Sequence, residues 1–149
     1  QKYGKRLIVS THPRTRKKLE SLGKKKFNSK IEFLKPLGFF DYNKLQTSAF
    51  CVLSDSGTIT EEASFLKFPA VMIRQAHERP EGMDAGVLIM SGLKADRVMD
   101  SINIVTKQHL VGAPAPIQDY QLAEKVSAQV VKVIQSYTDY INRVVWRKP

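Results

Sequence analysis

The stretch FCVLSDSGTITEEASFLKFPAVMI, residues 50–73, places a polar turn and a helical segment between two apolar runs. Residues 50–53 and 70–73 are short and continuously apolar, which is typical of strands in a parallel sheet that is buried on both faces. Residues 60–66 have the pattern of a short helix between them. A strand, a helix and a second strand in this order predict a parallel crossover and hence an α/β fold.

The alternation of strands and helices continues on both sides of this stretch. Further strands are expected at residues 6–10, 31–34 and 87–90, further helices at residues 13–22, 41–48, 94–107 and 118–145, and a linker at residues 111–116. Pro13 and Gly23 delimit the first of these helices, and Asp41 is the expected cap of the second. We therefore expect a Rossmann-like domain over residues 1–117, with a doubly wound, mostly parallel sheet that binds its ligand at the carboxyl ends of the strands.

The last predicted helix, within residues 118–149, carries an apolar stripe at helical spacing. Two arrangements fit this stripe: it packs entirely on the domain's own sheet, or its far end, with Tyr140 and Trp146, reaches another domain. A helix of ~28 residues is ~42 Å long, which exceeds the diameter of a small domain. We therefore expect the helix to complete the domain and to extend from it toward a further lobe.

The positive charge of the chain is concentrated at one end. The formal net charge is +10, and residues 1–35 hold 12 Lys and Arg against two acidic residues. One interpretation is a basic module that binds nucleic acid or another polyanion. No aromatic residues interleave with these charges and no nucleic-acid motif is visible, so we favour a solvated helix face that attracts an anionic substrate.

Several features indicate a cytoplasmic protein. The single cysteine, Cys51, excludes an intramolecular disulfide framework, and it lies in the apolar run FCVL, which predicts an inert core residue. No apolar run approaches the ~18–20 residues of a membrane helix, and the first residues do not have the layout of a signal peptide.

Three polar segments follow predicted strands: residues 10–15 (STHPRT), 54–62 (SDSGTITEE) and 77–84 (HERPEGMD). Because the carboxyl ends of parallel strands meet at one edge of a sheet, we expect these segments to converge on one cleft. His12, in the first segment, would lie at its strand end and face this cleft.

The second segment, SDSGTITEE, leaves a buried strand and enters a helix. The amides at such a helix start, together with the helix dipole, favour an anion beside Ser56 and Gly57. Thr58 followed by Glu61 also has the spacing of a capping box, and both interpretations fit at once. The carboxylates of Glu61 and Glu62 suit a ligand with hydroxyl groups, such as a ribose.

The third segment, HERPEGMD, contains Arg79, whose guanidinium is suited to a phosphate or a carboxylate. The alternative is a surface loop in which Arg79 pairs with Glu78 or Glu81. The three histidines of the chain are scattered, and the sequence has neither a Walker loop nor a glycine-rich dinucleotide fingerprint. We expect no metal and no cofactor.

In this order and spacing, STHPRT, SDSGTITEEASFLKFPAVMIR and HERPEGMDAG resemble the C-terminal domain of non-hydrolysing UDP-N-acetylglucosamine 2-epimerases. STHPRT and HERPEGMD are most similar to a branch that acts on 6-deoxy sugars, UDP-2-acetamido-2,6-dideoxy-L-talose 2-epimerase, which makes UDP-N-acetyl-L-fucosamine for surface polysaccharide. The family has two Rossmann-like lobes in the glycosyltransferase-B arrangement, and this chain resembles only the second. The resemblance implies a cytoplasmic isomerase, typically a homodimer, of which this chain alone is inactive.

The resemblance also implies a role for each matching residue. Ser56, Gly57 and the amide of Thr58 would hold the UDP diphosphate, and Glu62 would bind the ribose. Arg79 would reach the phosphates or the sugar from the loop that also contains Glu78, and His12, the catalytic candidate, would lie near the diphosphate and sugar. Tyr42 and Leu37 would lie near the uracil. Thr58 stands where many relatives have a second glycine, and Leu37 stands where some have a polar residue, so contacts at both positions would run through the backbone.

The reaction that the resemblance implies inverts C2 of a UDP-2-acetamido sugar, by elimination and re-addition of UDP. One alternative keeps the site and changes the reaction, as in the C-terminal lobe of a nucleotide-sugar glycosyltransferase. The other alternative is the basic polyanion-binding module described above.

Overall fold

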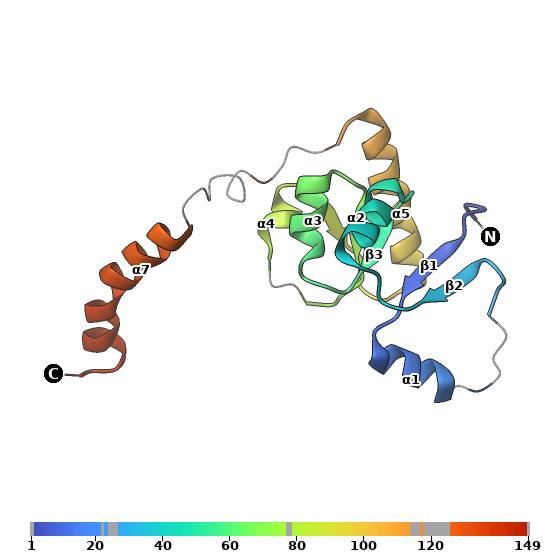
Figure 1. Ribbon diagram of the computed structural model, residues 1–149. Helices are drawn as coiled ribbons and strands as arrows, with labels where there is room; N and C mark the ends of the chain where they lie inside the picture. The colour runs from blue at the N-terminus through green and yellow to red at the C-terminus, as the bar shows by residue number, and fades with distance from the viewer. Residues whose placement is uncertain are drawn as a thin grey trace. The chain divides into compact units, whose positions relative to one another are not determined.

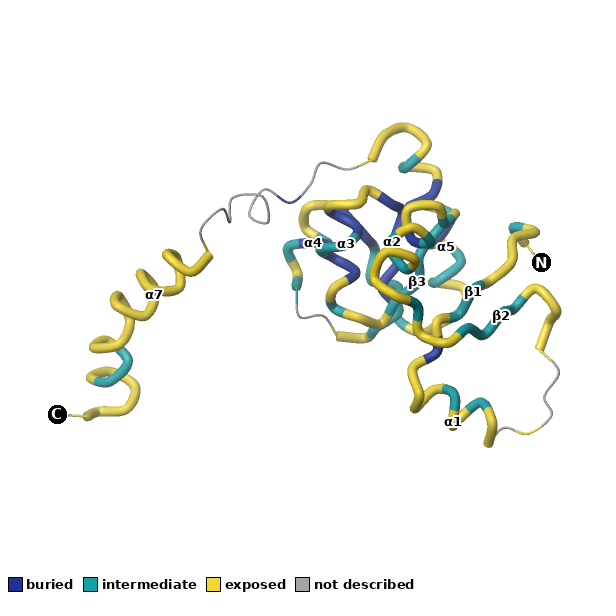
Figure 2. Tube along the Cα trace, in the orientation of Figure 1, coloured by how far each residue is buried: buried dark blue, intermediate teal, exposed yellow. Residues whose placement is uncertain are grey.

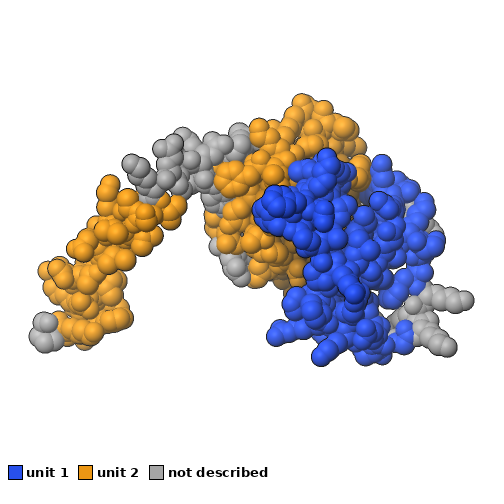
Figure 3. Space-filling model, viewed as in Figure 1, with its two compact units in different colours: residues 1–49 blue, residues 50–149 orange. Residues whose placement is uncertain are grey.

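The computed structural model describes residues 2–21, 23, 27–76, 79–113, 117 and 126–148. The chain divides into two compact units, Gln1–Ala49 and Phe50–Pro149 (Figure 3). Among the described residues every strand pairing is parallel, and helices connect consecutive strands (Figure 1). The α/β class with parallel strands, which the sequence predicts, is therefore confirmed.

The first unit contains one β–α–β crossover followed by a second helix. Its elements are β1 (Leu7–Ser10), α1 (Pro13–Ser21), β2 (Ile31–Leu34) and α2 (Phe39–Ser48). β1 and β2 pair in parallel along their whole length. The Thr11 amide and hydroxyl both donate to the Leu34 carbonyl, at 3.0 and 2.6 Å, and Thr11 is only 2% exposed. These two bonds fix the point at which the chain leaves β1, directly before His12.

The second unit is built around a three-stranded sheet with β4 in the centre. Its elements are β3 (Val52–Ser54), α3 (Ile59–Leu66), β4 (Ala70–Met72), α4 (Glu81–Asp84), β5 (Leu88–Met90), α5 (Ala95–Val111), α7 (Val126–Tyr140) and the π-helix η1 (Ile141–Val145). The register aligns Ser54 with Met72 and Met72 with Met90. The carboxyl ends of the three strands therefore share one edge, and the segments that follow β3 and β4 both begin there.

The hydrophobic core of the second unit is centred on β4, whose three residues are all buried. Figure 2 marks the buried segments of this unit, which lie among α3, α4 and α5. The core cluster consists of Ile59, Ala63, Phe68, Ala70, Met72, Val87, Leu88 and Ile117. The Ile117 amide donates to the buried Ser64 hydroxyl at 2.9 Å, so the chain beyond α5 is attached to α3. This packing holds the start of α3 rigidly at the end of β3.

The structure corrects several of the expected elements. The described strands form separate sheets of two and three strands rather than one continuous sheet. Gly38, and not Asp41, is the N-cap of α2, so Asp41 lies in the first turn of that helix, where its charge favours the helix dipole. α5 continues to Val111, into the predicted linker, and the helix α4 was not expected. Of the predicted C-terminal helix, residues 118–125 lie outside the described residues.

The helix α7 has no buried residue, although it is amphipathic. Figure 2 shows exposed residues over most of its length. The large apolar residues that lie exposed between Val126 and Val144 have exposed fractions of 48% to 57%. A groove of about 300 Å³ is lined by Ile134, Tyr137, Ile141 and Trp146, among others. Among the described residues, no helix is both long and apolar enough to cross a membrane.

Candidate functional site

The turn between β3 and α3 forms the centre of the candidate site. Ser54 ends β3, and its hydroxyl accepts the Ser56 amide at 3.1 Å. The Ser56 hydroxyl lies 2.9 Å from the Thr58 hydroxyl and accepts the Thr58 amide at 3.4 Å. Ser56 and Thr58 are both exposed, whereas Ile59, the first residue of α3, is fully buried. Two hydroxyls are thus held at the solvent-facing, positive end of a helix that is anchored in the core.

The expected capping box at the start of α3 is not formed. Thr58 is the N-cap, but its side chain makes no capping hydrogen bond. The Ser56 hydroxyl bonds the Thr58 amide instead, and the carboxylate of Glu61 is paired elsewhere. The capping-box interpretation is therefore wrong, because the partner that draws Glu61 away comes from a distant segment that local spacing does not reveal.

That partner is Arg79, which lies between β4 and α4. Arg79 Nε is 2.6 Å from Glu61 Oε1, and the two side chains are 34% and 31% exposed. The ion pair brings the third predicted segment to the first turn of α3, as the convergence argument requires for these two segments. Glu61 was not among the loop carboxylates considered from the sequence as partners of Arg79, namely Glu78 and Glu81. Glu78 lies outside the described residues.

The close approach of α4 to α3 explains why Arg79 reaches Glu61. Gly82 in α4 packs directly on Thr60 in α3, and a Cβ atom at position 82 would overlap the Thr60 methyl group. Thr60 is 0% exposed, so it cannot move aside. The Gly82 amide donates to the Arg79 carbonyl at 3.4 Å, which ties the Arg79 backbone to this contact. Neither Gly82 nor the Glu61–Arg79 pair was singled out from the sequence, although EGMD and the adjacent glutamates of ITEE were visible signals.

Five of the predicted site residues that the structure describes belong to the second unit. Ser56, Gly57 and Thr58 form the turn, Glu62 lies half-buried in the first turn of α3, and Arg79 is joined to that turn through Glu61. The Glu62 amide donates to the Thr58 carbonyl at 3.0 Å, which continues the helix from the turn. The arrangement offers hydroxyls, amides, a carboxylate and a guanidinium along one edge of the sheet.

The other described candidates, His12, Leu37 and Tyr42, belong to the first unit. His12 is exposed, and its Nδ1 accepts the Arg14 amide at 3.3 Å, so the imidazole caps α1. Leu37 precedes α2 and Tyr42 lies within it, both half-buried. That these three side chains share a site with Ser56 stays a prediction.

Two exposed aromatic residues were missed between Leu37 and Tyr42. Phe39 and Phe40 open α2, are 74% and 84% exposed, and contact each other edge-to-face with ring centroids 5.5 Å apart. Within GFFDY, the sequence had singled out Asp41 as a helix cap and Tyr42 as a neighbour of the uracil, but neither phenylalanine. The two rings form an exposed apolar pair, and contiguous exposed apolar surface of this kind often marks an interaction site.

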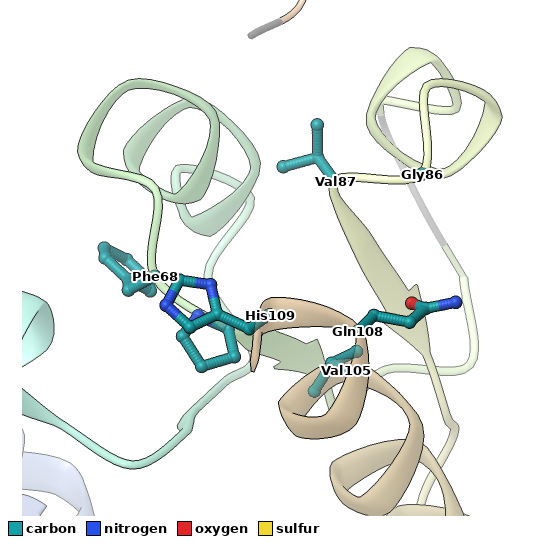
Figure 4. A pocket seen from close by; sticks show the side chains of 7 residues that line it. Phe68, Gly86, Val87, Val105, Gln108 and His109 are labelled. Atoms are coloured by element: carbon teal, nitrogen blue, oxygen red, sulfur yellow. The ribbon is translucent and has the colours of Figure 1, made fainter. Parts of the chain in front are cut away.

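A small, partly open pocket of the second unit lies away from the Ser56 turn. It has a volume of about 20 Å³, and its lining includes Phe68, Val87 and His109 (Figure 4). Phe68 and Val87 precede β4 and β5, so this pocket lies at the amino ends of the strands, opposite the Ser56 turn. Its volume suits about one water molecule, which is too small for a ligand. Among the described residues, no three His, Cys, Asp or Glu side chains are placed to hold a metal ion together.

A family model described as UDP-N-acetylglucosamine 2-epimerase matches residues 1–135 of the chain. The chain therefore belongs to the UDP-N-acetylglucosamine 2-epimerase family. A UDP-N-acetylglucosamine 2-epimerase of Methanocaldococcus jannaschii is 36% identical over 106 residues, which are 69% of this chain and 29% of that protein. This match favours the epimerases over the glycosyltransferase alternative.

Solved structures of the family have the same fold. The UDP-N-acetylglucosamine 2-epimerase from Rickettsia bellii superimposes with a TM-score of 0.72 at 52% identity, covering 96% of this chain and 39% of that one. The M. jannaschii enzyme, solved in complex with UDP-GlcNAc and UDP, gives a TM-score of 0.72 at 30% identity, covering 90% of this chain and 36% of that one. The chain thus corresponds to one lobe and spans about a third of the length of these relatives.

Proposed function

We propose that this chain is the UDP-binding part of a nucleotide-sugar 2-epimerase that inverts C2 of a UDP-2-acetamido sugar. The observation that carries the proposal is the exposed Ser56–Thr58 turn at the start of α3, with Arg79 held beside that helix. Family membership and the relative solved with UDP-GlcNAc and UDP support the choice of ligand.

In this proposal the site stabilises the charge that develops on UDP as it leaves the sugar. Helix amides, the Ser56 hydroxyl and Arg79 are preorganised donors for that charge. Retention of UDP in the site makes its return to the other face of the intermediate effectively unimolecular. Glu62 binds the ribose, Leu37 and Tyr42 lie near the uracil, and His12 lies near the diphosphate and sugar. Most proton transfers belong to the part of the relatives that this chain does not match.

The proposal has finer points. The motif resemblance suggests the 6-deoxy branch, a role in surface polysaccharide synthesis and a homodimer. The composition and the pattern of elements suggest a cytoplasmic location, a Rossmann-like domain at residues 1–117 and a C-terminal helix that contacts a further lobe.

Titration calorimetry with UDP, UDP-N-acetylglucosamine and inorganic phosphate tests the proposal. We expect the chain to bind UDP and the nucleotide sugar in preference to phosphate, because the nucleoside adds contacts. Arg79→Ala should weaken UDP binding about tenfold or more, as expected when a charge-assisted contact is lost. Arg143→Ala, an exposed arginine on η1, is the matched control and should leave UDP binding unchanged.

Two outcomes would count against the proposal. Equal affinity for phosphate and UDP would show that the chain has no nucleoside pocket. Undiminished UDP binding by Arg79→Ala would show that Arg79 does not belong to the site. A titration at two salt concentrations separates the polyanion alternative, because polyanion binding collapses steeply as salt rises.

A further inference from the structure

We propose that Glu61 is a positioning residue, which holds Arg79 through Nε so that the two Nη groups are presented to the diphosphate of the ligand. This inference rests on the proposed function, because it assigns Arg79 to the phosphates. The motif resemblance assigns no role to Glu61. From the sequence, its spacing suggested a capping box, and its carboxylate suited a ligand with hydroxyl groups.

The ion pair between Arg79 and Glu61 is made through a single nitrogen of the guanidinium. A guanidinium has one N–H at Nε and four at its Nη groups. The short contact of 2.6 Å runs from Nε to a single carboxylate oxygen, Glu61 Oε1. An arginine that only neutralises a glutamate gains most from a two-pronged contact that uses both oxygens. Contact at Nε alone leaves the outer edge of the guanidinium, with both Nη groups, outside this interaction and in the geometry that matches a phosphate.

The Glu61 carboxylate is also held in an unusual environment. Glu61 Oε2 is buried and has no hydrogen-bond partner among the described residues. A buried acceptor without a partner is costly, so it needs an explanation. A glutamate kept for its effect on Arg79 provides one, since its Oε1 must stay beside Nε. The enclosed Oε2 also restricts rotation of the carboxylate.

The backbones of Glu61 and Arg79 are both fixed by their surroundings. Glu61 lies in the first turn of α3, next to the fully buried Thr60. Gly82 packs on Thr60, and the turn that follows Arg79 is closed by the Asp84 amide, which donates to the Pro80 carbonyl at 3.0 Å. The Arg79 side chain is therefore ordered before any ligand arrives, which reduces the entropy cost of binding.

A double-mutant cycle on UDP affinity, measured by calorimetry with the full chain, tests the inference. We expect Glu61→Ala to weaken UDP binding about tenfold, within the range measured for interacting residues. Glu61→Gln, which keeps an oxygen acceptor of the same reach, should recover part of this loss. In the Arg79→Ala background, Glu61→Ala should change the affinity by less than about twofold, because Glu61 then has no arginine to position.

The matched control is Glu32→Ala. Glu32 also pairs with an arginine, Arg6, at 3.4 Å, but this pair is exposed and lies in the other unit. Its removal should leave UDP affinity unchanged. The Arg79 Hε signal in NMR spectra gives a readout without ligand: it should exchange slowly with water in the wild type and rapidly in Glu61→Ala.

The outcomes distinguish the two proposals. If the wild type does not bind UDP, the proposed function fails, and the role of Glu61 fails with it. If the wild type binds UDP but Glu61→Ala binds as well or better, or loses the same factor in both backgrounds, only the positioning role is overturned. If Glu61→Ala does not fold, Glu61→Gln decides in its place: unchanged affinity together with a fast-exchanging Arg79 Hε would overturn the role.

Discussion

Gly82 and Thr60 define how closely two helices of the second unit approach each other. A side chain at position 82 would meet a residue that is 0% exposed, and the Thr60 hydroxyl already lacks a hydrogen-bond partner among the described residues. The glycine is thus required for its small size, since its φ is not among the positive values of the chain. The small size of Gly82 therefore determines how closely Arg79 can approach α3.

Gly82→Ala should therefore destabilise the chain by about 1–3 kcal/mol, as overpacking of a filled interior does. It should also weaken UDP binding in the proposed function, because α4 must shift and carry Arg79 away from Glu61. Urea denaturation measures the first effect and calorimetry the second. Gly112→Ala is the control, because nothing lies within 4 Å of a Cβ atom there; equal stability of the two variants would contradict the close-contact argument.

Cys51 predicts a dependence of stability on alkaline pH. Burial raises the pKa of its thiol from 9.0 to about 12. Below pH 9 the thiol is protonated in both the folded and the unfolded state, so it has no effect on the pH dependence there. Above pH 9 only the unfolded state releases the proton, and the free energy of unfolding should fall by up to about 1.4 kcal/mol per pH unit until about pH 12.

The measurement is the free energy of unfolding between pH 8 and pH 11 for the wild type and for Cys51→Ala. Other groups titrate in this range, so the informative quantity is the difference between the two slopes. If the free energy of unfolding falls with pH no more steeply in the wild type than in Cys51→Ala, the folded state does not hold the thiol proton as proposed. The same burial should keep Cys51 unreactive toward iodoacetamide at neutral pH, as expected for the inert residue that the sequence indicates.

At the scale of elements, the stripe on α7 continues into a π-helix. η1 is five residues long, and the Trp146 amide donates to the Ile141 carbonyl at 3.0 Å, five residues back. The wider turn changes the angle between successive side chains, so the spacing that holds along α7 does not extend unchanged to Trp146. Lys148 Nζ lies 4.5 Å from the Trp146 ring centroid, which partly covers this exposed indole.

The exposure of α7 predicts that its apolar face contributes little to the stability of this chain. Ile134 and Tyr137 are 54% and 56% exposed. Replacing both by Gln should change the free energy of unfolding by less than about 0.5 kcal/mol. Val71→Ala, in the buried centre of β4, should cost about 2 kcal/mol, as loss of buried apolar surface does. A loss in the double variant as large as that in Val71→Ala would mean that α7 packs on the chain's own sheet.

The sequence predicts elements well where they are bounded by residues with strong local preferences. β2 occupies residues 31–34 as expected, because Pro36 follows closely and charged residues flank it. α4 escaped prediction because four residues carry no periodicity, and its form depends on Gly82 packing on Thr60. Local patterns encode secondary structure, whereas contacts across more than a few residues decide such short elements.

The candidate site was predictable to a similar extent. Ser56, Thr58 and Arg79 could be singled out because the turn and the guanidinium have a recognisable chemistry by themselves. Their connection through Glu61 could not, because two adjacent glutamates offer the same charge and only the helix geometry selects one of them. The capping box was incorrectly predicted for a related reason: the spacing of Thr58 and Glu61 fits it, but Arg79, from a distant segment, pairs with Glu61 instead.

At the scale of the whole molecule, the chain spans about a third of the length of its relatives and corresponds to that part of the proposed machinery. We expect the isolated chain to bind UDP weakly and to show no epimerase activity. NMR spectroscopy of UDP-N-acetylglucosamine during prolonged incubation measures the inversion at C2 directly. Clear turnover by the isolated chain, absent in Arg79→Ala, would contradict the assignment of the proton transfers to the unmatched part.

The parallel pairing of β3, β4 and β5 has a consequence for biosynthesis. A parallel pair cannot close as a hairpin, so each pairing must wait until the crossover between its strands has been made. β4 obtains both neighbours only when β5, which ends at Met90, has emerged from the ribosome. Until then, the fully apolar centre of the nascent sheet has an open edge, and its protection during translation falls to whichever chaperones meet the growing chain.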